Sequence, residues 1–179
     1  MRPSTIMSPA PTEGKHVVLT GGEPMIMPDI AELCAALRSK GFHITIETAA
    51  TVFRKLPIDL ASMSPKLSNS TPYERDGGRF AVAHEKNRLN VPVIQQFIDT
   101  SPDFQLKFVV AKPSDLDEID DLLSQLSNWQ PADVQLMPEG TDIDVLRSRA
   151  GWIGEVCKRR GFRYSPRLHI EMFGNKRGT

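Results

Sequence analysis

A turn that could bind a ligand carrying an ammonium group follows the first apolar segment of the chain. The segment His16–Leu19 runs directly into Thr-Gly-Gly-Glu-Pro at residues 20–24. Glycines in such a turn let the backbone approach a ligand closely. Glu23 beside them can accept hydrogen bonds from an ammonium group. The same letters also fit an ordinary strand, tight turn and helix, so the rest of the chain must decide.

Further polar residues that could do chemistry follow or interrupt other apolar segments. Glu47 ends one such segment, Ser64 and Lys66 follow another, and Gln135 lies in a third. Lys107 stands between apolar neighbours, where a charge is unfavourable unless it points into a polar cavity. Each of these side chains could instead be an ordinary solvated residue.

The elements that must position these residues alternate between strands and helices. Apolar and β-branched segments predict strands at 16–19, 42–47, 58–63, 105–110 and 134–137, and a last strand within 162–173. Helical spacing of apolar residues predicts helices at 29–40, 91–100, 114–126 and 143–161. Asp29 is the expected cap of the first helix, and Ser114 with Asp117 forms a predicted capping box. Residues 64–84 are predicted to form a long loop.

This alternation indicates a parallel α/β sheet. Five or six strands would build either an open doubly wound sheet or a partial barrel. In both architectures, ligands bind at the carboxyl ends of the strands. Thr20, Glu47, Ser64, Lys66 and Gln135 lie at or after the ends of predicted strands. We therefore expect one ligand-binding rim.

The composition excludes several other classes of protein. The chain has 179 residues, with 22 Lys and Arg against 22 Asp and Glu. This neutral balance argues against direct nucleic-acid binding, and no apolar run approaches the roughly 20 residues that cross a bilayer. We expect a cytoplasmic protein with a flexible lead-in at 1–14 and a single domain at 15–179. Cys34 and Cys157 lie on apolar helix faces and are expected to be buried hydrophobes rather than a disulfide.

Six segments carry motifs whose order and spacing resemble one family. They are residues 17–24, 46–48, 63–66, 106–110, 134–140 and 166–178. Together they resemble the 7-carboxy-7-deazaguanine synthases, radical S-adenosylmethionine enzymes of queuosine and deazapurine biosynthesis. The resemblance implies a partial (β/α) barrel of the radical S-adenosylmethionine type, with mostly parallel strands and flanking helices. It also implies a radical ring contraction of 6-carboxy-5,6,7,8-tetrahydropterin with loss of ammonia, using a 4Fe-4S cluster and Mg²⁺.

The same resemblance implies roles for particular residues. The S-adenosylmethionine contacts would be Gly21, Gly22, Glu23, Ser64, Lys66 and Gln135. The contacts to the pterin substrate would be Thr20, Gly22, His169 and the C-terminal carboxylate of Thr179. The resemblance further implies a homodimer and a reductant such as flavodoxin or ferredoxin.

The chain departs from this family before its first strand. Relatives carry three closely spaced cysteines there, which hold the cluster, whereas no residue before Thr20 is a cysteine. Our hypothesis is an N-terminal truncation with Met1 an internal start, lacking the first strand and helix of the barrel, the cluster ligands and the Mg²⁺ loop. We expect such a chain to retain no four-iron cluster. The alternatives are a non-catalytic S-adenosylmethionine-binding module and a related radical activase.

Overall fold

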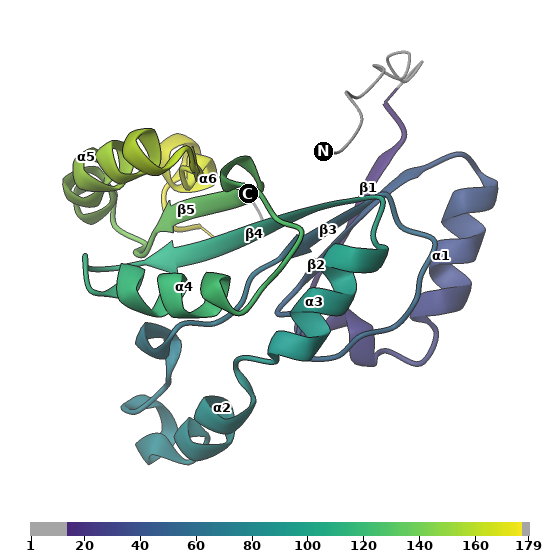
Figure 1. Cartoon of the computed structure of the whole chain (residues 1–179), viewed down its shortest axis with the longest axis horizontal. Coiled ribbons are helices and arrows are strands. Elements are labelled where there is room, and N and C mark those ends of the chain that lie inside the picture. The colour runs from purple at the N-terminus through teal and green to yellow at the C-terminus, as the bar shows by residue number, and fades with distance from the viewer. Residues whose placement is uncertain (1–13, 177–179) are drawn as a thin grey trace.

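A parallel sheet forms the centre of the computed structural model, which describes residues 14–176 (Figure 1). Its strands are β1 His16–Leu19, β2 His43–Thr48, β3 Leu60–Met63, β4 Asp103–Val110, β5 Val134–Pro138 and β6 Arg163–Tyr164. Residues 1–13, which make up most of the predicted lead-in, and residues 177–179 lie outside the described part. The predicted strands are confirmed, with ends that shift by one or two residues.

In the described part of the chain, five helices lie in the connections between these strands, and a sixth follows the last strand. They are α1 Ile30–Ser39, α2 Ala81–Asn87, α3 Val91–Thr100, α4 Asp115–Ser124, α5 Ile143–Arg160 and α6 Leu168–Phe173. The sequence predicted α1, α3, α4 and α5, and α5 ends at Gly161 in the left-handed conformation, with φ of 72°. Figure 1 shows α1, α3, α4 and α5 arranged around the sheet.

The order of the strands decides between the two architectures that the sequence allowed. A doubly wound sheet reverses its strand order at a switch point. Here β1 to β6 pair in sequence order, and every neighbouring pair is parallel. Right-handed crossovers that always advance in one direction place their helices on the same face. The described chain therefore forms a partial (β/α) barrel.

The two faces of the sheet differ in polarity. Residues of one face, such as Ile46 on β2, Phe108 on β4 and Leu136 on β5, are 0% exposed and form the core with the helices. Their neighbours along the strands point the other way, because successive side chains of a strand alternate between faces. That opposite face is half-buried and carries Glu47 and Lys107. It is the face on which a ligand site can be built.

Both cysteines lie on the core side of the sheet. Cys34 on α1 and Cys157 on α5 are free and buried, which confirms their prediction as small hydrophobes. Burial raises the pKa of both thiols, because a thiolate is poorly solvated there.

The predicted capping box of α4 is wrong. Ser114 makes no side-chain cap, and the Asp115 carboxylate instead binds the turn that precedes the helix. The Asp115 Oδ2 accepts from the backbone N–H groups of Ala111 at 2.7 Å and Lys112 at 3.1 Å. A carboxylate is the stronger acceptor for such N–H groups, and Asp115 is only 4% exposed.

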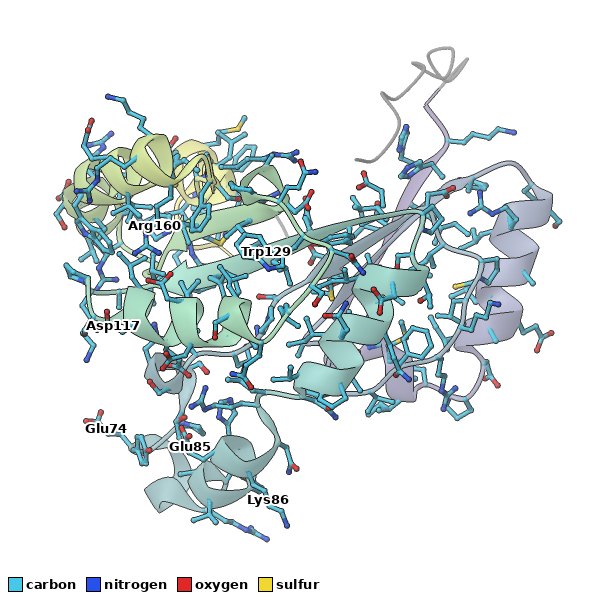
Figure 2. The ribbon with its side chains drawn as sticks, viewed as in Figure 1. Glu74, Glu85, Lys86, Asp117, Trp129 and Arg160 are labelled. Atoms are coloured by element: carbon cyan, nitrogen blue, oxygen red, sulfur yellow. The ribbon has the colours of Figure 1, made fainter. Side chains whose placement is uncertain are left out.

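Two predicted segments also contain more helix than expected. Residues 64–84, predicted as loop, include the start of α2, and the segment 162–173 contains only the short strand β6 before α6. Ala81 is the buried residue of α2, so the helix has no apolar stripe for the sequence to reveal. Figure 2 shows Glu85 and Lys86 on α2, with Lys86 directed away from the rest of the molecule.

Asp59 provides a pH-dependent link between α1 and β2. Its carboxylate accepts from Arg38 Nη1 at 2.8 Å and from the Ile44 N–H at 2.7 Å. Burial by itself would raise the pKa of Asp59, but these hydrogen bonds and the Arg38 charge outweigh it and lower that pKa. A lowered carboxyl pKa stabilises the fold above the unfolded pKa of about 3.9, and this stabilisation is lost as the pH falls through the folded pKa.

We therefore expect Asp59→Asn to lower the free energy of unfolding at pH 7 by about 1–3 kcal/mol. The stability difference from wild type should shrink as the pH falls below about 4, because Asp59 of the unfolded chain then takes up a proton while the folded carboxyl, with its lowered pKa, still resists protonation. Urea unfolding between pH 3 and pH 7 measures this difference. A gap that stayed constant over that range would contradict the assigned role of the carboxylate.

Candidate functional site

The glycine turn after β1 faces open space. A Cβ added at Gly21 or Gly22 would meet no atom within 4 Å, and Gly21 has a φ of 147°, which favours glycine. A cavity of about 640 Å³ lies here, lined by residues 18–24 together with side chains at the start of α1. The backbone of the turn is therefore open to the cavity.

Glu23 joins this turn to the end of β2. Its Oε1 accepts from the Met25 N–H at 3.1 Å and from Thr48 Oγ1 at 2.7 Å, and its Oε2 accepts from the Ala49 N–H at 2.9 Å. An ionised carboxylate has about four acceptor positions, so it can still accept from one further donor. Glu23 therefore shapes the turn and keeps capacity for an ammonium group.

Thr20, Glu47 and Lys107 form a chain of contacts on the open face of the sheet. Thr20 Oγ1 donates to Glu47 Oε2 at 3.2 Å, and Lys107 Nζ donates to Glu47 Oε1 at 3.3 Å. The Lys107 side chain is 17% exposed. Lys107 has apolar neighbours in the sequence, but its ammonium group pairs with the Glu47 carboxylate on the polar face of the sheet.

Lys66 lies where the ends of β2, β3 and β4 approach one another. Burial lowers the pKa of Lys66, and the Lys107 ammonium lowers it further, while Glu23 and Glu47 partly oppose this shift. A second cavity of about 480 Å³ adjoins it and is lined by Ser64, Lys66, His84, Glu139 and Arg167, among others. Glu23, Glu47 and Lys107 come from separate segments of the sequence. The structure brings them close enough to Lys66 for their charges to influence it.

Lys66 should reduce the stability of the unliganded fold. A lysine with a lowered pKa binds its proton less well in the folded than in the unfolded chain, so stability rises with pH between the two pKa values. We expect Lys66→Met to unfold at the same or a higher urea concentration than wild type at pH 7. Any gain in stability of Lys66→Met over wild type should decline as the pH rises toward 10.4, the ordinary lysine pKa. A clear loss of stability at pH 7 would contradict this.

Gln135 belongs to a set of polar residues that the sequence analysis only partly found. Its Nε2 donates to Gln105 Oε1 at 2.5 Å, and Gln105 Nε2 donates to Ser62 Oγ at 2.8 Å. The sequence prediction missed Gln105 and Ser62. The signal was the alternation on β4, since Gln105 lies two residues before Lys107 and so shares its face.

The two remaining predicted contacts are not placed at these cavities. His169 is exposed on α6, within the segment where a strand was predicted, and it lines neither cavity. Thr179 lies outside the described residues. Their proposed contact with a substrate stays a prediction.

Between residues 14 and 176, no group of three or more His, Cys, Asp or Glu side chains could hold a metal ion. Cys34 and Cys157 are buried on different helices, so they do not fit an iron–sulfur cluster, which needs clustered thiolates. In the same part of the chain, no helix combines the length and hydropathy needed to cross a membrane.

Sequentially ordered parallel strands define a partial (β/α) barrel, and polar residues gather at the carboxyl ends of those strands, where barrels of this kind bind their ligands. The chain is 44% identical over 165 residues to the 7-carboxy-7-deazaguanine synthase of Rhodopirellula baltica, covering 92% of this chain and 64% of the relative. For the enzyme of Halobacterium salinarum the identity is 41% over 169 residues, with 89% and 65% covered. For that of Pyrobaculum aerophilum it is 31% over 170 residues, with 91% and 67% covered. The chain therefore belongs to the 7-carboxy-7-deazaguanine synthase family.

Solved structures agree with this fold. The crystal structure of QueE from Escherichia coli matches with a TM-score of 0.60 and 27% identity, covering 87% of this chain and 57% of that one. SuiB from Streptococcus suis shares the fold alone, with a TM-score of 0.56 at 16% identity over 88% of this chain and 40% of that one. No family model matches the chain. The chain spans about two thirds of the length of the curated relatives named above.

Proposed function

We propose that this chain provides the cofactor- and substrate-binding rim of a 7-carboxy-7-deazaguanine synthase. In that reaction a radical derived from S-adenosylmethionine drives ring contraction of 6-carboxy-5,6,7,8-tetrahydropterin, with loss of ammonia. The observation that carries the proposal is the open Gly21-Gly22 turn with Glu23 fixed beside it, in a chain 44% identical to a named synthase.

The rim residues would divide the work between cofactor and substrate. The backbone at Gly21 and Gly22 and the free acceptor position of Glu23 suit the amino-acid end of S-adenosylmethionine. Ser64 and Lys66 would contact its carboxylate or ribose oxygens, and Gln135 would contact its adenosyl part.

Thr20 and Glu47 form the substrate side of the proposed site. Their hydrogen bond of 3.2 Å supports a shared surface for the pterin next to the cofactor turn. Gly22, His169 and the Thr179 carboxylate remain proposed substrate contacts from the family resemblance. When bound, the cofactor would supply the radical chemistry, and this chain's residues would orient its carbon against the substrate and exclude water.

A chimaera tests the proposal directly. The part of the Rhodopirellula baltica relative outside the matched region would be joined to this chain and loaded anaerobically with iron and sulfide. With S-adenosylmethionine, a reductant, Mg²⁺ and carboxytetrahydropterin, mass spectrometry should detect 7-carboxy-7-deazaguanine. A Glu23→Ala chimaera is the negative control. A loaded chimaera that binds S-adenosylmethionine but makes no product would overturn the synthase proposal and favour a binding module.

The other features implied by the family are part of the same proposal. They are a single domain over residues 15–179, a flavodoxin or ferredoxin reductant, Mg²⁺, a homodimer and a cytoplasmic location. Size-exclusion chromatography with light scattering on the chimaera tests the dimer, and omission of Mg²⁺ from the assay tests the ion.

A further inference from the structure

His84 on α2 lines the second cavity and belongs to a hydrogen-bonded network with two neighbouring side chains. Thr71 Oγ1 donates to Glu85 Oε1 and lies 3.3 Å from His84 Nδ1. The other carboxylate oxygen, Glu85 Oε2, accepts from Arg88 Nε at 2.8 Å. Thr71 is buried, with 9% of its surface exposed. The Glu85–Thr71–His84 network therefore joins α2 to the segment that follows Lys66.

Glu85 sets the direction of these hydrogen bonds, because an ionised carboxylate only accepts. The hydrogen bonds from Thr71 and Arg88 lower the pKa of Glu85, so the carboxylate is ionised at neutral pH. The single proton of the Thr71 hydroxyl therefore points to Glu85, and a lone pair of Thr71 Oγ1 accepts from His84 Nδ1–H. The opposite direction would bring two oxygens together without a proton between them, which is unfavourable.

This direction leaves Nε2 of the neutral His84 ring as an acceptor, since a neutral imidazole carries one proton only. Among residues 14–176, the buried side-chain nitrogen or oxygen without a partner is His43 Nδ1, so His84 Nε2 is open to solvent. Lys66 lines the same cavity and supplies a donor. A ligand group that pairs with both must donate and accept, as a hydroxyl does.

We infer that His84 accepts a hydrogen bond from a ribose hydroxyl of the cofactor, and that Thr71 and Glu85 are positioning residues that keep the proton of its neutral ring on Nδ1. The inference rests on the proposed function, which places the carboxylate or the ribose oxygens of S-adenosylmethionine at Ser64 and Lys66, on the wall of this cavity. The acceptor at Nε2 selects the ribose from these two groups, because a carboxylate has no proton to donate.

The test measures binding of 5′-deoxyadenosine, and of its two analogues that lack the 2′- or the 3′-hydroxyl, to the full chain by NMR titration. Wild type is expected to bind one analogue roughly 3- to 10-fold more weakly than the parent nucleoside, as for the loss of one neutral hydrogen bond. His84→Phe keeps a ring without nitrogen and should reduce this preference to about 1.5-fold or less. His16→Phe, at an exposed position at the start of β1, is the matched control and should keep the preference.

Variants of Thr71 separate positioning of the ring from direct contact with the ligand. Thr71→Val keeps the shape but lacks the hydroxyl, so the neutral His84 ring is free to carry its proton on either nitrogen. The preference should then weaken, and Thr71→Ser, which keeps the hydroxyl, should restore it. Thermal unfolding checks each variant for folding. If Thr71→Val does not fold, Glu85→Gln replaces it, because an amide NH₂ can donate to Thr71 and let the hydroxyl turn to Nδ1.

A second readout follows the tautomer of His84 without any nucleoside. In the neutral ring of wild type and of Thr71→Ser, ¹⁵N NMR should show a protonated Nδ1 and an unprotonated Nε2. In Thr71→Val the signals should shift toward a mixture of both tautomers. Addition of 5′-deoxyadenosine to wild type should move the Nε2 signal, because that nitrogen then accepts a hydrogen bond.

Several results would overturn the inference. They are a proton on Nε2 of the neutral wild-type ring, equal binding of the parent and both analogues by wild type, an unchanged preference in folded His84→Phe, or no nucleoside binding up to the solubility limit. A response of His84 to pterin-6-carboxylate alone would assign the residue to the substrate and would also overturn it.

Failure of the proposed function is distinguishable from failure of this inference. If only the proposed function failed, the chimaera would make no product while the nucleoside preference and its loss in His84→Phe persisted. If only the inference failed, the chimaera would make product, and His84→Phe would leave its KM for S-adenosylmethionine unchanged.

Discussion

The variant Arg88→Met is expected to lose about 3–5 kcal/mol of unfolding free energy. Arg88 joins α2 to α4 by pairing with Glu85 and Glu118, and its Nη1 also donates to the Lys66 carbonyl at 3.0 Å. The Arg88 side chain is 14% exposed and that of Glu118 is 22% exposed. Removing the guanidinium leaves a partly buried carboxylate unpaired, which is more unfavourable than the loss of a surface ion pair.

Urea unfolding at pH 7 measures this loss. Arg147→Met is the matched control, because Arg147 forms an exposed pair with Asp144, with side chains 72% and 87% exposed, and should change stability by less than about 0.5 kcal/mol. Arg88→Lys should recover only part of the stability, since an ammonium lacks the planar fork that reaches several acceptors. Equal effects of Arg88→Met and Arg147→Met would refute the role of this ion-pair network.

The same variant should disturb the predicted cofactor segment. Glu118 accepts from the Ser68 N–H and Oγ at 2.9 Å. Arg88 and Glu118 therefore hold the chain at Lys66 and at Ser68. We expect faster amide hydrogen exchange at Ser68 in Arg88→Met, because its acceptor loses the charge that positions it. Exchange at Ile46 in the core of β2 provides the internal reference.

A Glu23→Gln substitution is expected to weaken both the fold and the turn that it shapes. The amide keeps one acceptor oxygen but places an NH₂ group opposite either the Ala49 N–H or the donors at Oε1. Hydrogen bonds to a charged group contribute about 1.5–3 kcal/mol each, so we expect a loss of roughly 2 kcal/mol of unfolding free energy. S-adenosylmethionine binding should fall at least tenfold, because the ammonium also loses its counter-charge.

Calorimetry and urea unfolding on the same preparation separate these two effects. Glu32→Gln, at an exposed position of α1, is the control that removes a carboxylate nearby without breaking the Glu23 contacts. If Glu23→Gln were as stable as wild type, the three hydrogen bonds of Glu23 would not contribute to the stability of the fold. Unchanged S-adenosylmethionine affinity in a folded variant would instead remove Glu23 from the proposed cofactor site.

Local patterns in the sequence were sufficient for most of the elements. β1 and α3 have the predicted ends, His16–Leu19 and Val91–Thr100, because alternation and helical spacing are properties of neighbouring residues. The exceptions are elements without an apolar pattern. Helix α2 is held by the polar contacts of Arg88 and Glu85. The capping box expected at Ser114 is absent, and Asp115 binds the turn before α4 instead.

The sequence by itself determined the strand–helix alternation, the glycine turn after β1, the rim positions of Glu47 and Lys66, and the family resemblance. Tertiary structure alone decided between the doubly wound sheet and the barrel, and it joined Ser62, Gln105 and Gln135 into a ladder. The physical reason is the distance along the chain over which each kind of interaction acts. Propensity and periodicity act over a few residues, whereas contacts between distant residues depend on which strands pair and in what register.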